Sequence, residues 1–200
     1  MPSETTYDFA GKYTAEGRIG RWLVDRFYSS LGDILVRCAP TRCIEVGCGE
    51  GFSSERIRRL AGPHVQFAAL DVEPRLVRAA RLRNPGVPFC LGSIYALPFP
   101  DDAADTVLAL EVLEHLESPL DALAELRRVA ARWIVLSVPR EPLWRILNLA
   151  RLRYARSLGN TPGHRNHWSR SSFVAFAGAA GAVREVRSPV PWTQVLVELA

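Results

Sequence analysis

The sequence is poor in lysine: its 25 basic residues include one lysine, Lys12, and the rest are arginines. The formal net charge is +4, but the arginines are scattered along the chain rather than grouped in one segment. Recognition of nucleic acid needs basic side chains clustered on one face, so this distribution favours an ordinary solvated surface. A nucleic-acid partner therefore stays open but is not favoured.

Long apolar runs and a secretory leader are also missing. No apolar run approaches the roughly 18 residues needed to cross a bilayer, so we expect no transmembrane segment. The N-terminal residues include Glu4 and Asp8 and lack a basic start followed by an apolar stretch, which is unlike a secretory signal. We therefore expect a cytoplasmic protein.

The four cysteines (Cys38, Cys43, Cys48 and Cys90) contain no C-x-x-C pair, the spacing with which zinc sites usually begin. Cys43 and Cys90 lie in or beside apolar, strand-like runs, where a free cysteine packs as a small hydrophobic residue. We expect all four to be reduced and structural.

The order of apolar patterns along the chain predicts the fold. Helical spacing predicts a first helix at residues 17–38, after which strand-like and helix-like segments alternate. Several strands are continuously apolar, which is typical of parallel strands buried on both faces. We expect an α/β fold, a doubly wound, mostly parallel seven-stranded sheet of Rossmann-like type with helices on both faces. The expected strands are 42–46, 65–70, 87–91, 105–110, 133–138, 183–186 and 193–199, and the further helices are 53–60, one from 74, 119–130 and 171–180.

A glycine-rich turn, E-V-G-C-G-E-G at residues 45–51, follows the first strand and precedes a helix. Glycine permits a tight turn and lets a ligand approach the backbone closely. A dinucleotide-binding G-x-G-x-x-G motif would need glycine where Phe52 stands, and no Gly-Lys-Ser/Thr follows to make a phosphate loop. By itself, the turn is equally consistent with a βα connection that binds nothing.

Asp71 strengthens the case for a ligand. It ends the next strand, about 20 residues on, where a carboxylate can accept hydrogen bonds from both hydroxyls of a ribose. The alternative is that Asp71 caps the helix that begins near Pro74. Gly47, Gly92 and Glu111 likewise come just after predicted strands, and ligands of such sheets bind at the carboxyl ends of strands.

Two further motifs complete the pattern: L-G-S-I-Y-A-L-P-F at 91–99 and D-T-V-L-A-L-E-V-L-E-H-L at 105–116. Together the motifs resemble the class I S-adenosylmethionine-dependent methyltransferases, over residues 42–139. The resemblance implies an enzyme with S-adenosylmethionine as cofactor. One departure is that the family usually has an acid after the glycine at 92, where this chain has Ser93. The cofactor-binding residues that the resemblance implies are Gly47 and Gly49 (methionine part), Asp71 (ribose), Ser93 and Ile94 (adenine), Leu110 and Glu111 (amino group), and also Glu45 and Val72.

The E-x-x-E-H stretch formed by Glu111, Glu114 and His115 is a second constellation. On a helical turn these positions share one face, so the three side chains can converge. The stretch is similar to ubiquinone-pathway O-methyltransferases and to the 2′-O-methyltransferases that act on the 3′ ends of small RNAs. The latter also have a His-x-x-x-Trp-Ser/Thr-Arg stretch, which His164 begins in this chain.

Three interpretations of this constellation stay open. The plainest is a solvated helix face on which His115 is an ordinary polar residue. The second makes His115 and Glu111 catalytic, with a general base among them. The third adds a divalent ion, Mg²⁺, Mn²⁺ or Zn²⁺, held by Glu111, Glu114, His115 and His164.

The chain is expected to be a single domain (1–200) of four parts: helix 17–38, a cofactor-binding core 41–139, a lid-like helical insertion 141–159, and a C-terminal helix with strands at 160–200. Within 142–159 apolar residues fall on one helical face and arginines on the other. We favour a lid over the acceptor pocket. The alternative is peripheral contact with an anionic membrane surface.

The function expected from these features is O-methylation of a small-molecule acceptor. An RNA-directed 2′-O-methyltransferase is the first alternative, and a protein that binds S-adenosylmethionine without catalysis is the second. A continuous basic groove would favour RNA, whereas a closed apolar pocket would favour a small acceptor.

Overall fold

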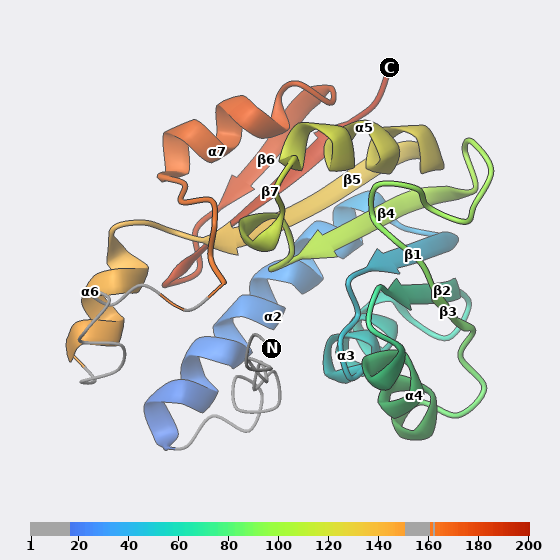
Figure 1. Cartoon of the computed structure of the whole chain (residues 1–200), viewed down its shortest axis with the longest axis horizontal. Helices are drawn as coiled ribbons and strands as arrows, with labels where there is room; N and C mark the ends of the chain where they lie inside the picture. The colour runs from blue at the N-terminus through green and yellow to red at the C-terminus, as the bar shows by residue number, and fades with distance from the viewer. Residues whose placement is uncertain (1–16, 151–160, 162) are drawn as a thin grey trace, which may run out of the picture.

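The structure is a computed structural model that describes residues 17–150, 161 and 163–200 (Figure 1). Seven strands form one sheet in the order β3-β2-β1-β4-β5-β7-β6. Strands β1 to β5 pair in parallel, and β7 is antiparallel to both of its neighbours. The predicted fold class is confirmed. The strands are β1 (Arg42–Val46), β2 (Gln66–Asp71), β3 (Phe89–Leu91), β4 (Ala104–Leu110), β5 (Ala130–Pro139), β6 (Ala182–Arg187) and β7 (Trp192–Glu198).

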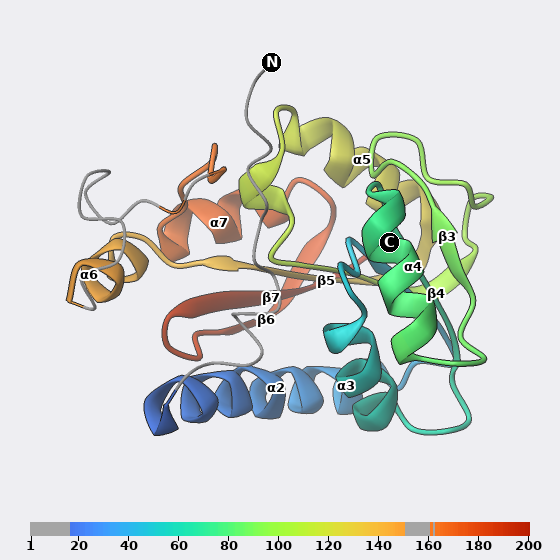
Figure 2. The ribbon, with the colours of Figure 1, turned by 60° about the horizontal axis from the view of Figure 1, so that its bottom comes forward.

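Helices cover both faces of the sheet (Figures 1 and 2). One face carries α2 (Arg18–Cys38), α3 (Phe52–Ala61) and α4 (Pro74–Arg83), and the other carries α5 (Pro119–Val129) and α7 (Arg170–Ala177).

Each face has its own hydrophobic core, because side chains along a strand point alternately to the two sides. Leu108 of β4 packs in the same core as Leu31 of α2, whereas its neighbour Val107 packs with Leu126 of α5 and Phe173 of α7. All five side chains are buried. The strands are therefore apolar on both faces, which is why they occur in the sequence as continuous apolar runs.

Element ends lie close to the predicted ones, with local exceptions that have physical causes. Strand β3 begins at Phe89 rather than at 87, because Pro88 has no N–H to donate to the ladder. Strand β5 begins earlier than predicted, at Ala130, because Ala130 pairs with Ala104 at the start of β4. Among the described residues, none of the helices combines the length and apolar character needed to span a bilayer.

The sheet order creates a place for a ligand between β1 and β4. From β1 the chain builds β2 and β3 on one side, and it then crosses back to place β4 on the other side of β1. The connections after β1 and β4 therefore leave in opposite directions, which opens a crevice at the carboxyl ends of these strands. The glycine turn, Asp71 and Glu111 all lie at this edge.

The insertion after β5 is described in part. Helix α6 (Leu143–Ala150) follows β5 and lies at one end of the molecule, away from α3 and α4 (Figure 1). The rest of the segment expected to form the lid, 151–159, lies outside the described residues.

Candidate functional site

A cavity of about 640 Å³ lies at the carboxyl ends of β1, β2 and β4. This volume is in the usual range for pockets that bind small molecules and cofactors. One side of the cavity is formed by the glycine turn and by Asp71, and the other side by His115, Gly163 and Arg165. Residues on both sides of the fold's crevice therefore share one continuous space.

The glycine turn has a backbone conformation that requires glycine. Gly47 has a φ of 79° and Gly49 a φ of 53°, both in the left-handed region. The N–H groups of Gly47 and Cys48 both donate to the carbonyl of Leu70 at 2.9 Å, which ties the turn to β2. A Cβ atom on Gly47 would lie 2.4 Å from Cγ2 of Val112, so a side chain has no room there.

Asp71 organises the turn as well as facing the cavity. Its Oδ2 accepts a hydrogen bond from the N–H of Gly49 at 2.9 Å, and its Oδ1 accepts one from the N–H of Glu73 at 2.9 Å. Burial raises the pKa of Asp71, and these backbone donors act in the opposite direction. The alternative that Asp71 caps the next helix is wrong, because the N-cap residue of α4 is Glu73.

Most residues expected at the cofactor line this cavity. The exceptions are Glu45 and Ser93, which do not line it. The Ser93 hydroxyl instead accepts a hydrogen bond from the N–H of Tyr95 at 3.2 Å within a local turn. The expected residues that do line the cavity are Gly47, Gly49, Asp71, Val72, Ile94, Leu110 and Glu111.

Glu45 lies beneath the turn instead of facing the cavity. Its side chain is 1% exposed, and its carboxylate accepts a hydrogen bond from the Ser54 hydroxyl of α3. Burial raises the pKa of Glu45 to about 7, although hydrogen bonds from Ser53 and Ser54 oppose the shift. We therefore correct the expected cofactor contact of Glu45 to a structural contact between β1 and α3.

The raised pKa of Glu45 predicts a pH-dependent stability. Glu45 gains a proton at about pH 7 in the folded protein but only near its ordinary value of 4.5 in the unfolded chain. The contribution to stability is thus fully present below pH 4.5 and is lost as the pH rises towards 7. Relative to wild type, Glu45→Gln should gain about 3 kcal/mol in its free energy of unfolding between pH 4.5 and 8.

Urea denaturation at several pH values measures this difference. Glu55→Gln, on the exposed face of α3, is the matched control and should follow the wild-type curve. Parallel curves for wild type and Glu45→Gln would show that Glu45 does not titrate in this range.

Glu111 adopts a different position from the one expected. It has a φ of 59°, so the chain turns sharply before the short 3-10 helix η1 (Leu113–His115) begins. Its carboxylate accepts hydrogen bonds from the Ser137 hydroxyl at 3.1 Å and from Nε1 of Trp192 at 2.7 Å. The expectation that Glu111 shares one helical face with Glu114 and His115 is therefore wrong, although Glu111 does line the cavity.

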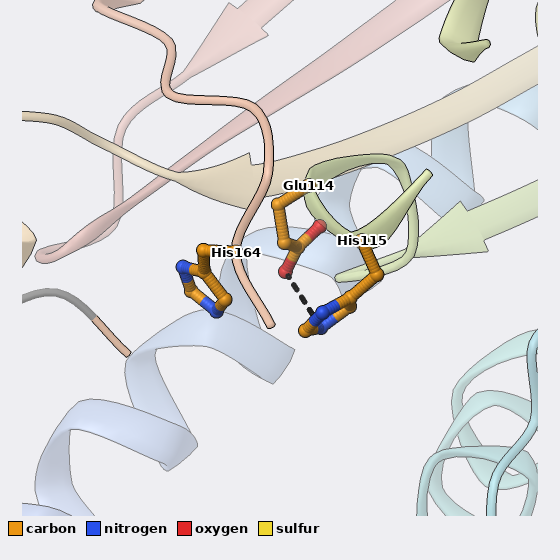
Figure 3. Close-up of side chains that lie close together, drawn as sticks. All are labelled: Glu114, His115 and His164. Atoms are coloured by element: carbon orange, nitrogen blue, oxygen red, sulfur yellow. Dashed lines mark ion pairs between the residues drawn. The ribbon is translucent and has the colours of Figure 1, made fainter. Parts of the chain in front are cut away.

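Glu114, His115 and His164 do come together (Figure 3). One ligand atom of each lies within 4.8 Å of those of the other two. Oε1 of Glu114 is 3.9 Å from Nε2 of His115, and the two imidazole rings meet edge to face with centroids 5.0 Å apart. Glu114 and His164 are buried, whereas His115 reaches the cavity.

The contact of His115 with Gly163 indicates which ring nitrogen carries the hydrogen. Nδ1 of His115 lies 3.1 Å from the carbonyl oxygen of Gly163. Because a carbonyl oxygen accepts and cannot donate, Nδ1 carries the hydrogen, and Nε2 carries the lone pair of the neutral ring. Nε2 is buried and faces the carboxylate of Glu114, so a proton or a cation bound there would lie between these two side chains.

Sequence reasoning missed the contribution of Gly163 and Arg165 to the cavity. Both come from the segment after the insertion, and their nearness to His164 was the one available signal. Arg165 pairs with Glu117 at 2.6 Å, and Arg75, also on the cavity wall, pairs with Glu73 at 3.5 Å. The arginines at the cavity thus have acidic partners beside them.

Helix α6 lies against the same cluster. The Trp144 ring stacks on His164 with centroids 6.1 Å apart, and its Nε1 donates to the Thr161 hydroxyl at 2.9 Å. Trp144 also packs 5.9 Å from Trp192, which is the donor to Glu111. The insertion therefore contacts both the histidine cluster and the support of Glu111.

Part of the chain is similar in sequence to known methyltransferases. A family model described as a methyltransferase domain matches residues 44–132. The chain is 34% identical over 93 residues to a probable S-adenosylmethionine-dependent methyltransferase of Mycolicibacterium smegmatis. The matched segment covers 46% of this chain and 35% of that protein. It is 32% identical over 126 residues to malonyl-[acyl-carrier protein] O-methyltransferase of Halorhodospira halophila, with 61% and 41% covered. The chain thus spans less than half of these relatives.

A solved structure has a similar fold. Magnesium protoporphyrin IX methyltransferase of Synechocystis PCC 6803, solved with bound SAH, superposes with a TM-score of 0.68 at 18% identity and covers 92% of this chain and 88% of that one. The family match contains the glycine turn, Asp71 and the Glu111–His115 segment. Residues 44–132 match the methyltransferase domain, and the relatives that this part of the chain resembles include probable S-adenosylmethionine-dependent methyltransferases.

Proposed function

We propose that this protein transfers the methyl group of S-adenosylmethionine to an oxygen atom of a small molecule. The observation that carries the proposal is the single cavity shared by the glycine turn, Asp71 and His115. A methyl donor on the turn and an acceptor beside His115 would be in direct reach of each other. The Halorhodospira relative, named an O-methyltransferase, supports oxygen as the attacked atom.

The residues of the cavity divide into two roles. Gly47 and Gly49 allow close approach to the backbone, and Asp71 offers its carboxylate to the ribose. The cofactor supplies a methyl group already activated by the positive sulfur, so the protein has mainly to align the acceptor and remove its proton. As the methyl group passed from the sulfur to the acceptor oxygen, His115 would take up the proton that this oxygen loses.

A divalent ion at Glu114, His115 and His164 is an alternative to proton uptake by His115. Two imidazoles and one carboxylate suit Zn²⁺ or Mn²⁺ better than Mg²⁺, which prefers oxygen ligands. Their ligand atoms are close enough to share one ion. Such an ion would lower the pKa of an acceptor hydroxyl. Glu111 is no longer included among the ligands, because its carboxylate is held by Ser137 and Trp192.

The charges at the cavity favour a small acceptor over RNA. Arg75 and Arg165 line the cavity, but each lies beside a glutamate rather than in a continuous basic groove. Val112 and Leu116 add apolar surface near His115. RNA binding would require arginines free to meet phosphates along a groove.

A screen with isotope-labelled cofactor tests the function. Cell extracts are incubated with the protein and S-adenosylmethionine that carries a deuterated methyl group, and mass spectrometry identifies compounds that gain it. We expect a small molecule to gain one labelled methyl only when protein and cofactor are both present. Cofactor binding without any methyl gain would support a non-catalytic role, and a labelled RNA would support the RNA-directed alternative. Tighter binding of nicotinamide dinucleotides would contradict the whole proposal.

A further inference from the structure

The segment that returns from the insertion is fastened to η1 by hydrogen bonds. The N–H groups of Arg165 and Asn166 both donate to the carbonyl of Glu114, at 2.7 and 3.1 Å. The Asn166 side chain adds two more bonds, because its Nδ2 donates to the carbonyls of Leu113 at 3.1 Å and Leu116 at 2.7 Å. One asparagine thus holds the carbonyls on both sides of Glu114 and His115.

The returning segment also meets the end of β5, where the N–H of Glu141 donates to the carbonyl of Trp168 at 2.9 Å. Helix η1 has three residues, so most of its carbonyls have no partner within the helix. An amide group has two N–H donors in a fixed fork, and Asn166 directs them to two carbonyls of the same turn. The bond from Nδ1 of His115 to Gly163 joins the same two segments.

We infer that Asn166 is a positioning residue, which sets His115 and His164 against Glu114 and thereby assembles the acceptor half of the cavity. The inference rests on the proposed function for its effect on turnover. His115 belongs to η1, and His164 lies two residues before Asn166 on the opposing segment. Their mutual position therefore depends on the hydrogen bonds between the two segments, to which Asn166 contributes two, together with the bridge from Trp168 to the end of β5.

The cofactor half of the cavity has its own asparagine. Nδ2 of the buried Asn84 donates to the carbonyls of Gly51 at 2.9 Å and Ala80 at 3.3 Å, which ties the glycine turn to α4. Asn84 and Asn166 therefore perform the same task on opposite sides of the cavity. This symmetry supplies a matched pair of variants.

The test compares Asn166→Asp and Asn166→Ala with Asn84→Ala. The aspartate keeps the size of the side chain but replaces both N–H donors by an acceptor that faces two carbonyls. We expect both Asn166 variants to lower kcat by roughly 10- to 100-fold, while the KM for S-adenosylmethionine stays within about 3-fold of wild type. Asn84→Ala should show the reverse pattern, with weakened cofactor binding. Equal kcat in Asn166→Asp and wild type, or a kcat loss matched by an equal loss of cofactor binding, would overturn the inference.

A second measurement is independent of turnover. The chain has four histidines, so their imidazole signals can be assigned individually by NMR, with exposed His64 as an internal reference. In Asn166→Asp, the signals of His115 and His164 should move and that of His64 should not. Unchanged His115 and His164 signals would overturn the inference even if no acceptor is ever found. Shifted signals in a protein without methyl transfer would uphold the positioning role and contradict the proposed function alone.

Discussion

Replacing Asp71 with alanine should weaken binding of S-adenosylmethionine by roughly 100-fold, or about 3 kcal/mol. The substitution removes two contributions at once. It deletes the carboxylate that would accept hydrogen bonds from the ribose, and it releases the N–H of Gly49 from Oδ2. Isothermal titration calorimetry with the cofactor and with its demethylated product measures the loss.

Two controls separate these contributions. Asp71→Asn keeps one oxygen acceptor but loses the charge, so its affinity should fall between those of wild type and Asp71→Ala. Asp101→Ala removes an exposed aspartate far along the chain and should leave the affinity unchanged. If Asp71→Ala bound the cofactor as tightly as wild type, Asp71 would have no part in the site.

Replacing His115 with alanine should lower kcat by about 10²- to 10⁴-fold, the range that a positioned proton acceptor contributes. His115 is the member of the histidine cluster that lines the cavity. Cofactor affinity should change little, because His115 lies on the side of the cavity opposite the glycine turn. Turnover of an acceptor found in the extract screen, measured beside calorimetry, checks both statements.

Removal of divalent ions distinguishes the two roles of His115. If an ion is bound, a chelator and His164→Ala should each abolish turnover, and added Mn²⁺ or Zn²⁺ should restore it in the wild type. Metal affinity should then be unaffected by Glu111→Gln, because Glu111 lies outside the cluster. An enzyme indifferent both to the chelator and to His164→Ala would exclude the ion and leave His115 as a base alone. Full activity in His115→Ala would exclude both roles.

The sheet and the cofactor half of the cavity were predictable because their signals are local. Parallel strands buried on both faces give continuous apolar runs, and the glycine turn and Asp71 directly follow two of these strands. The alternation of side-chain directions along β1 also indicated that Glu45 does not face the cavity, and this signal was missed. Glu45 is two residues from Cys43, so both point to the face covered by α2 and α3 rather than to the end of the strand.

The acceptor half of the cavity was predictable only in part. Residues that are distant in the sequence determine the rest of its geometry. Spacing alone placed Glu111 on one face with Glu114 and His115, but one positive φ at Glu111 redirects its side chain. That conformation is supported by Ser137 and Trp192, which are remote in the sequence. Asn166 reaches η1 from beyond the insertion, and no local pattern records such a contact.

The antiparallel strand β7 has a consequence for the order in which the protein is made. It lies between β5 and β6, so β5 is an edge strand until residues 192–198 have left the ribosome. During that interval the apolar row of β5, which includes Ile134 and Leu136, has open backbone groups on one side and invites pairing with other chains. Glu111 also lacks its Trp192 donor until then. The support of Glu111 is therefore completed by the last strand of the sheet to be synthesised. A nascent chain stalled before residue 192 would expose the unpaired edge of β5 and would lack the Trp192 hydrogen bond to Glu111.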